Sequence, residues 1–211
     1  MTTYQVIDLE SFPRRNYYEY FMATDTMFEM TVKIDVTQAV KKCKDEAISF
    51  YAYSIFNLTN SVNKIPNLRY AHIDNQLVEW QELVPTFTNF NQETELFYTL
   101  WLEELTDYTS VDREYKKLIK DYANTTDIAP MGDVPPNVVN ISSIPWLHFE
   151  HFSSHSGAIK NNVTPMITIG KYEKGGSQLL MPVNIKVHHA TVDAYHVSLF
   201  FEILQREMNR A

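Results

Sequence analysis

A predicted strand and a predicted helix meet at two adjacent histidines near the end of the chain, and this junction most constrains the fold. Residues 179–187 are rich in Leu, Met, Val and Ile, which predicts a buried strand. Apolar residues then recur every three or four positions, as in an amphipathic helix: Val197, Phe200, Phe201, Leu204 and Met208. The histidines therefore follow a core strand and precede a core helix.

His188 and His189 end the predicted strand, where successive side chains point to opposite faces, so we expect one ring to pack and the other to face a cleft. Most such histidines are structural and bind backbone groups. Histidine also titrates near neutral pH, however, and suits proton transfer. Asp193 follows where a carboxylate caps a helix, and it either orients the site or pairs with a distant arginine.

Length and composition limit the function classes. The 211 residues predict one domain, residues 1–211, and 45% hydrophobic residues suffice for a large core. The net charge of −8 without a basic stripe argues against a nucleic-acid partner. Cys43 is the only cysteine, which fits a reducing compartment. With no signal-peptide pattern and no apolar run of about 18 residues, we expect a cytoplasmic protein without a membrane partner.

Helical and strand patterns are mixed along the chain without regular alternation, which predicts an α+β fold with a mixed β-sheet flanked by helices. Helices are predicted at residues 14–22, from an N-cap at Thr37 to about residue 60, and at 112–123. Hairpin turns are predicted at Asp74–Asn75 and Gly175–Gly176. Strands are predicted at 4–8, 27–36, 68–73, 76–83, 86–90, 95–102, 138–142, 164–172 and 178–187.

His148, His151 and His155 form a second histidine cluster, and together with the histidine pair they raise the question of a metal site. Their spacing suits a helix, yet residues 147–152 have the pattern of a strand, on which His148 and His151 would face opposite sides. We therefore predict no metal site and interpret these histidines as polar surface or pocket lining. The sequence also lacks a P-loop, a Gly-x-Gly-x-x-Gly motif and a Gly-x-Ser-x-Gly motif.

Several motifs together resemble one enzyme family. Residues 188–193, His-His-Ala-Thr-Val-Asp, are similar to the His-x-x-x-Asp-Gly motif of type A chloramphenicol acetyltransferases, which also marks dihydrolipoyl acyltransferases. Residues 140–146 resemble the Asn-Ile-Ser-x-x-Pro-Trp segment of the chloramphenicol enzymes, and residues 12–21 resemble their N-terminal arginine-plus-aromatic helix. Shorter matches follow in the same order, at 33–35, 92–95, 170–172 and 180–182. Each motif alone is weak, but in register they cover essentially the whole chain.

The resemblance implies a two-layer acyltransferase fold and a homotrimer with each site at a subunit boundary. It implies acetylation of a chloramphenicol hydroxyl, and thereby inactivation of the antibiotic, with acetyl-CoA as co-substrate and no tightly bound cofactor. His189 would be the general base, and Ser142 would donate a hydrogen bond to the oxyanion. Asp193 would pair with Arg14 and support the turn without touching substrate.

The resemblance also assigns the two substrate pockets. Coenzyme A would lie against Tyr51, Trp146, Lys171 and Tyr172. Thr168 would hold a water near the intermediate. The acceptor would contact Tyr20, Phe21, Phe28, Thr86, Thr88, Phe97, Asn140, Phe152 and Thr168.

The chain departs from the family pattern at a few positions. Ala194 replaces the glycine of the histidine motif, which would be strained at a positive φ. Thr86, Ala129 and Ser154 stand where the family commonly has glutamine, phenylalanine and leucine, so we expect a wider and more polar acceptor pocket. Ser49 replaces a lysine near the coenzyme A phosphates. Two alternatives stay open: the same acyl transfer to another hydroxyl acceptor, or a weakly catalytic paralogue that binds ligand.

Overall fold

The computed structural model describes residues 3–155 and 162–210. Its helices are α1 (Arg15–Thr24), α2 (Thr37–Asp45), α3 (Phe50–Asn63), the short 3-10 helix η1 (Pro66–Leu68), α4 (Tyr108–Asp121) and α5 (Ala194–Met208). Its strands are β1 (Tyr4–Val6), β2 (Met27–Asp35), β3 (Tyr70–Ile73), β4 (Gln76–Trp80), β5 (Val84–Asn91), β6 (Leu96–Trp101), β7 (Val138–Ile144), β8 (Met166–Gly170), β9 (Glu173–Gly175) and β10 (Gln178–His188).

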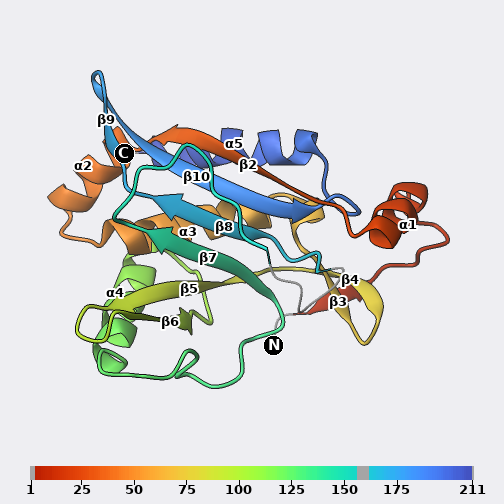
Figure 1. Ribbon diagram of the computed structural model, residues 1–211, viewed down its shortest axis with the longest axis horizontal. Helices are drawn as coiled ribbons and strands as arrows, with labels where there is room; N and C mark the ends of the chain where they lie inside the picture. Colours follow the sequence, from red (N-terminus) through yellow and green to blue (C-terminus); the bar gives the residue numbers. More distant parts are fainter. Residues whose placement is uncertain (1–2, 156–161, 211) are drawn as a thin grey trace.

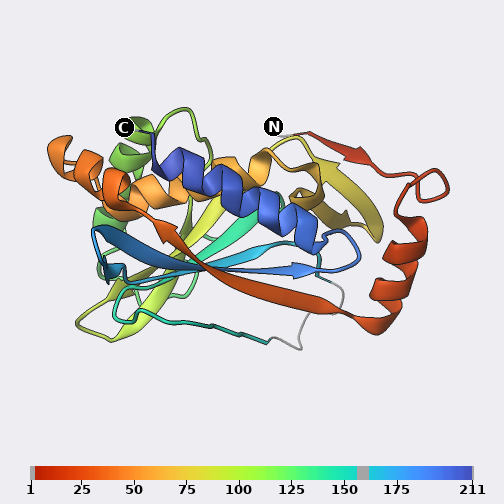
Figure 2. The same ribbon diagram turned by 90° about the horizontal axis from the view of Figure 1, so that it is seen from above.

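The main layer is a seven-stranded sheet in the order β2-β10-β8-β7-β5-β6, with β9 paired to β10. Strand β7 runs parallel to both β5 and β8, whereas the other pairs are antiparallel. Helices α3 and α5 cover one face of this sheet (Figures 1 and 2). A smaller sheet, β1-β4-β3, lies beside it. The predicted α+β class with a mixed sheet flanked by helices is confirmed.

Strand β10 organises the layer because its two faces differ in chemistry. Met181, Val183, Ile185 and Val187 are fully buried on the face that α3 and α5 cover. Their alternate neighbours must lie on the opposite face. Those neighbours include the polar residues Asn184, Lys186 and His188, which are also buried. The strand predicted at 178–187 is thus confirmed. One of its faces carries buried polar residues, which its apolar composition did not predict.

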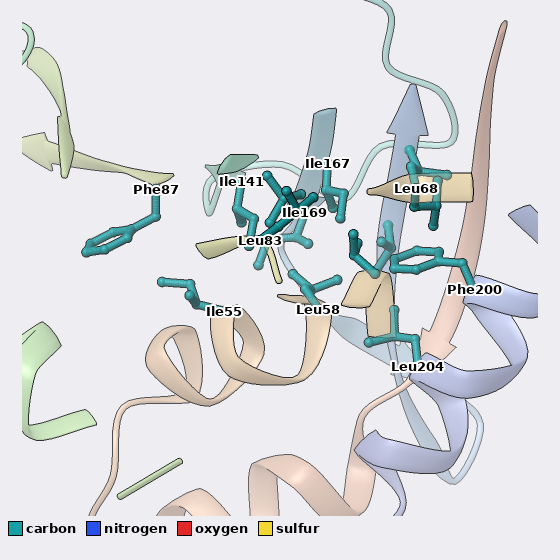
Figure 3. Packing of buried hydrophobic residues seen from close by; sticks show 14 of the residues in the cluster. Ile55, Leu58, Leu68, Leu83, Phe87, Ile141, Ile167, Ile169, Phe200 and Leu204 are labelled. Carbon is teal, nitrogen blue, oxygen red and sulfur yellow. The ribbon is translucent and has the colours of Figure 1, made fainter. Parts of the chain in front are cut away.

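The apolar core fills the space between sheet and helices. Figure 3 shows strand residues such as Ile141 and Ile167 facing Ile55 and Leu58 of α3. Phe200 and Leu204 of α5 complete this core and are both fully buried, as the three- and four-residue spacing predicts. Each such side chain contributes about 1.5–3 kcal/mol to the free energy of unfolding. None of the helices in the described ranges is long and apolar enough to cross a lipid bilayer.

Polar residues form a row across the face of the sheet opposite α3 and α5. Thr31, Asn184, Thr168 and Ser142 are neighbours in register on β2, β10, β8 and β7. On β5 the row is continued by Thr88, whose hydroxyl lies 3.4 Å from that of Ser142. This row brings residues more than a hundred positions apart in the sequence into one line.

The helix predicted from Thr37 to about residue 60 is wrong, because the chain breaks into α2 and α3 between residues 45 and 50. Ala47 takes a left-handed conformation, with φ of 54°, and Ser49 caps α3 by accepting a hydrogen bond from the N–H of Ala52. Thr37 is the first residue of α2 rather than its N-cap. The apolar positions keep helical spacing across the break, which hid it.

One further boundary and one further element differ from prediction. Helix α4 begins at Tyr108, four residues earlier than expected, because the Asp107 carboxylate accepts hydrogen bonds from the N–H groups of Thr109 and Ser110. The strand expected at residues 147–152 is absent, and this segment is irregular. The carbonyl of Leu147 accepts from the N–H of Lys171, and that of Phe152 accepts from the Asn184 amide.

Replacing Ala47 by glycine should raise the free energy of unfolding by about 0.5–1 kcal/mol. The exposed alanine is strained at its left-handed φ, which glycine adopts without strain. Urea denaturation at fixed protein concentration measures the change. The matched control is Ala23→Gly, in the exposed part of α1, which should lose about 1 kcal/mol. A loss of stability in both variants would contradict the strain at Ala47.

Candidate active site

The ring of His189 is held from three sides just beyond the end of β10. It stacks on Phe21, with ring centroids 4.0 Å apart and planes within 13°, and Phe28 meets it edge-on at 5.0 Å. Its Nδ1 lies 3.1 Å from the carbonyl oxygen of Val192. A carbonyl only accepts, so Nδ1 carries the proton in the neutral ring and Nε2 keeps its lone pair. The side chain is 32% exposed, which leaves it accessible to a ligand.

Arg14 ties the start of α1 to the turn that carries His189. Its guanidinium binds the Asp193 carboxylate with two nitrogens, one contact being 3.0 Å long, and also donates to the His189 and Ala190 carbonyls. This side-chain hydrogen bonding with Arg14 is the main cause that lowers the pKa of Asp193. Arg14 and Asp193 are thus paired as the resemblance implies, and their contacts support the backbone around the histidine.

Asp193 is the N-cap residue of α5, as predicted. Its backbone N–H donates to Nδ1 of His196 at 2.9 Å, which fixes the first turn of the helix. Burial lowers the pKa of His196 and favours the neutral ring that this bond requires. Ala194 follows as the first helical residue and does not have a positive φ, so the alanine in place of the family's glycine causes no backbone strain.

His188 is the packed member of the histidine pair. Its side chain has no exposed surface, and its Nδ1 accepts a hydrogen bond from the N–H of Ala190 at 3.1 Å. Burial lowers the pKa of His188, although Asp25 lies 3.5 Å from its Nε2. His188 therefore stabilises the turn as a neutral ring, while His189 alone has access to solvent.

Ser142 lies on β7 at the wall of a cavity of about 460 Å³. We call Thr88, Ser142, Thr168 and this cavity the serine half-site, and His189 with Phe21 and Phe28 the histidine half-site. Of the residues predicted from the sequence, the cavity wall includes Tyr51, Thr88, Phe97, Ser142 and Trp146. Sequence reasoning missed its other lining residues: Asn89, Phe90, Glu95, Tyr115, Ser143 and Pro145.

A second cavity of about 360 Å³ adjoins the first and shares Tyr51, Ser143 and Pro145 with it. Lys171 and Tyr172, both predicted to contact coenzyme A, line this second cavity. The Tyr51 hydroxyl donates to the Thr88 carbonyl at 3.1 Å, and burial raises the pKa of Tyr51, so this shared wall is a neutral, fixed ring. The two cavities thus adjoin each other close to Ser142.

Within one chain the two half-sites are too far apart to act together. Asn184 and Ser142 both align with Thr168, so Ser142 lies two strand spacings from β10, about 10 Å. His189 lies five residues beyond Asn184, about 16 Å along the strand direction at ~3.3 Å per residue. A general base and an oxyanion donor must each lie about 3 Å from the atoms they serve. One chain therefore holds the two groups in separate places.

Two other predicted acceptor residues, Tyr20 and Thr86, lie outside both cavities. Tyr20 is 65% exposed beside Phe21. Thr86 is buried, donates its hydroxyl to the Asn140 side chain at 3.0 Å, and lines neither cavity. The residues described here contain no group of three or more His, Cys, Asp or Glu side chains able to hold a metal. His148 instead contacts the Lys171 carbonyl at 3.0 Å.

The fold is that of a class of acetyltransferases. A solved structure of a chloramphenicol acetyltransferase matches with a TM-score of 0.90 and 20% identity, over 98% of this chain and 100% of that one. The dihydrolipoamide acetyltransferase of Azotobacter vinelandii matches with a TM-score of 0.69 and 10% identity, over 92% of this chain and 86% of that one.

Sequence comparison narrows the class. The chloramphenicol acetyltransferase family model matches residues 2–205. Chloramphenicol acetyltransferase 3 of Escherichia coli is 34% identical over 207 residues, covering 98% of this chain and 97% of that protein. A chloramphenicol acetyltransferase of Staphylococcus aureus is 33% identical over 204 residues, covering 96% and 95%. The chain therefore belongs to the chloramphenicol acetyltransferase family and is an acyltransferase, as its motifs predicted.

Arg14→Met should lower the free energy of unfolding at pH 7 by about 2 kcal/mol, because the Asp193 carboxylate and two carbonyls lose a charged donor. The folded-state pKa of Asp193 is depressed, so this contribution is full above the ordinary aspartate pKa of about 3.9 and is lost as pH falls through the depressed value. Denaturant titrations across this pH range measure it. Arg15→Met is the control, since its exposed pair with Glu19 is worth less than about 0.5 kcal/mol. Equal losses in the two variants would contradict a special role for Arg14.

Proposed function

We propose that the protein transfers the acetyl group of acetyl-CoA to a hydroxyl of chloramphenicol, with residues 1–211 acting as one domain. Membership of the family carries the proposal. The family relatives named above are chloramphenicol acetyltransferases. This chain has a histidine with Nδ1 bound to a carbonyl and with no hydrogen bond to Nε2 from the residues that the structure describes. The buried single thiol of Cys43 and the need for acetyl-CoA fit a cytoplasmic enzyme that inactivates the antibiotic.

The proposed reaction is a direct acyl transfer. Nε2 of His189 takes the proton of the acceptor hydroxyl while that oxygen attacks the thioester carbon. The Ser142 hydroxyl donates a hydrogen bond to the resulting oxyanion. The intermediate then collapses: the carbon–sulfur bond breaks, the imidazolium returns its proton to the departing thiolate, and the acetyl ester and coenzyme A leave. No atom or electron from another reactant is needed.

The two adjoining cavities suit the two substrates. The cavity lined by Lys171 and Tyr172 would hold coenzyme A, with the lysine near its anionic groups. The larger cavity, lined by Thr88, Phe97 and Ser142, would hold the aromatic acceptor. Tyr51 lies between them, so the thioester would reach the acceptor beside Ser142.

We further propose that each complete site joins two copies of the chain in a homotrimer, with His189 from one copy and Ser142 from its neighbour. The separation of the half-sites within one chain supports this arrangement, because a second copy can bring its His189 to the serine. Large apolar side chains are exposed on both half-sites, as at a subunit boundary: Tyr20, Phe97 and Trp146. A closed ring of three copies would repeat one such boundary three times.

The direct test is thiol release from acetyl-CoA by purified protein, with and without chloramphenicol. We expect chloramphenicol-dependent release, and a kcat about 10²–10⁴-fold lower in His189→Ala because the general base is lost. His151→Ala, an exposed histidine outside both half-sites, should turn over like the wild type. Full activity in His189→Ala would refute the mechanism. A folded protein that binds coenzyme A but ignores chloramphenicol would indicate another hydroxyl acceptor.

Mixing two inactive variants tests the shared site. When His189→Ala and Ser142→Ala chains are refolded together, each mixed trimer contains one boundary at which an intact histidine meets an intact serine. Random mixing should therefore restore roughly a quarter of the wild-type kcat, since about three-quarters of the trimers are mixed and one site in three is intact. The same variants refolded separately and then combined are the control. If mixed refolding gave no more activity than this control, each site would lie within one chain.

A further inference from the structure

Three polar residues, the half-buried Glu29 and the buried Asn184 and Lys186, hold the segment Phe152–Ser154 against the face of the sheet opposite α3 and α5. Lys186 of β10 donates from its Nζ to the carbonyl of Ser154. The Asn184 amide, two residues earlier on the same strand, donates to the carbonyl of Phe152 at 3.0 Å. The hydroxyl of Ser153 donates to Oε1 of Glu29 on β2 at 2.5 Å. Three consecutive residues of an irregular segment are thus each bonded to a strand.

The charges in this group make the arrangement specific. Lys186 is only 8% exposed, and lysine is seldom buried without a partner. Glu29 lies directly opposite Lys186 in the antiparallel pair β2–β10, so opposite charges face each other across the strands. The second Glu29 oxygen, Oε2, is buried without a hydrogen-bond partner among the described residues. A buried charge tolerates few alternative geometries, so moving the segment would leave the buried Lys186 poorly compensated.

The segment has a place in the proposed function, on which this inference rests. Phe152 and Ser154 occupy acceptor positions by family resemblance, and the strand contacts use their backbone carbonyls rather than their side chains. The acceptor wall would therefore be positioned by residues that do not themselves touch the acceptor. We propose that Glu29, Asn184 and Lys186 are positioning residues that set acceptor affinity by fixing the Phe152–Ser154 segment on the sheet.

The test separates acceptor binding from the other steps. Lys186→Met and Ser153→Ala each remove one donor, and each should raise the KM for chloramphenicol by about tenfold. The kcat and the KM for acetyl-CoA should stay at wild-type values, because neither the half-site histidine nor the coenzyme A cavity is altered. Glu29→Gln, which keeps an oxygen acceptor for Ser153, should retain most of the wild-type affinity. Lys33→Met is the matched control, since it breaks an exposed ion pair with Glu150 on the same stretch of chain and should change nothing.

Hydrogen–deuterium exchange without substrate gives a second readout, with faster exchange expected at residues 152–154 in Lys186→Met and not in Lys33→Met. An active wild type whose acceptor KM is unchanged in both Lys186→Met and Ser153→Ala would overturn the positioning role. Equal changes in kcat and in both KM values would also overturn it, since they would indicate general destabilisation. Ser153→Ala changes an exposed side chain, so it keeps the test valid even if Lys186→Met does not fold. A wild-type protein inactive with chloramphenicol would instead refute the proposed function.

Discussion

The bidentate contact between Arg14 and Asp193 is the interaction on which the rest of the site depends. It joins the start of α1 to the turn between β10 and α5, and the same guanidinium reaches the His189 carbonyl. Helix α1 also supplies Phe21, on which the His189 ring stacks. One charged contact therefore orients the histidine twice, through its backbone and through its aromatic neighbour. The neutral, buried His188 also stabilises this turn, because its Nδ1 accepts a hydrogen bond from the N–H of Ala190.

Local patterns predicted the elements whose burial follows a simple period. The strand β10, the helix α5 and the hairpin at Asp74–Asn75, where both residues have positive φ, follow from spacing and turn chemistry. The break before α3 did not follow, because Ala47 adopts a left-handed conformation without the glycine or asparagine that usually signals one. The strand predicted at 147–152 is absent, and the carbonyls of Leu147 and Phe152 accept from the N–H of Lys171 and the Asn184 amide instead of forming a ladder.

The site was predictable only where a motif or a resemblance linked distant residues. Nothing local relates Arg14 to Asp193, which are 179 positions apart. The contacts of Glu29 and Lys186 with residues 153 and 154 were not predicted either, because these residues are also far apart in the sequence. Lys186 was interpreted only as the residue that precedes the histidine motif. Pairing across a sheet depends on register, and a single sequence does not encode register in any one window. The hydrogen bond between Thr86 and Asn140 was likewise not predicted, since Asn140 lies on another strand.

The in-register row Asn184–Thr168–Ser142 has a consequence for the newly made chain. By its geometry the row keeps the serine well away from His189 within one molecule. On the proposed arrangement, an isolated chain holds its base and its oxyanion donor too far apart to act together and cannot hydrolyse acetyl-CoA. The site would then become active only on assembly, when a neighbouring copy of the chain also shields the acceptor pocket from bulk water. The hydrogen-bond register of the sheet would thus prevent unassembled chains from hydrolysing acetyl-CoA.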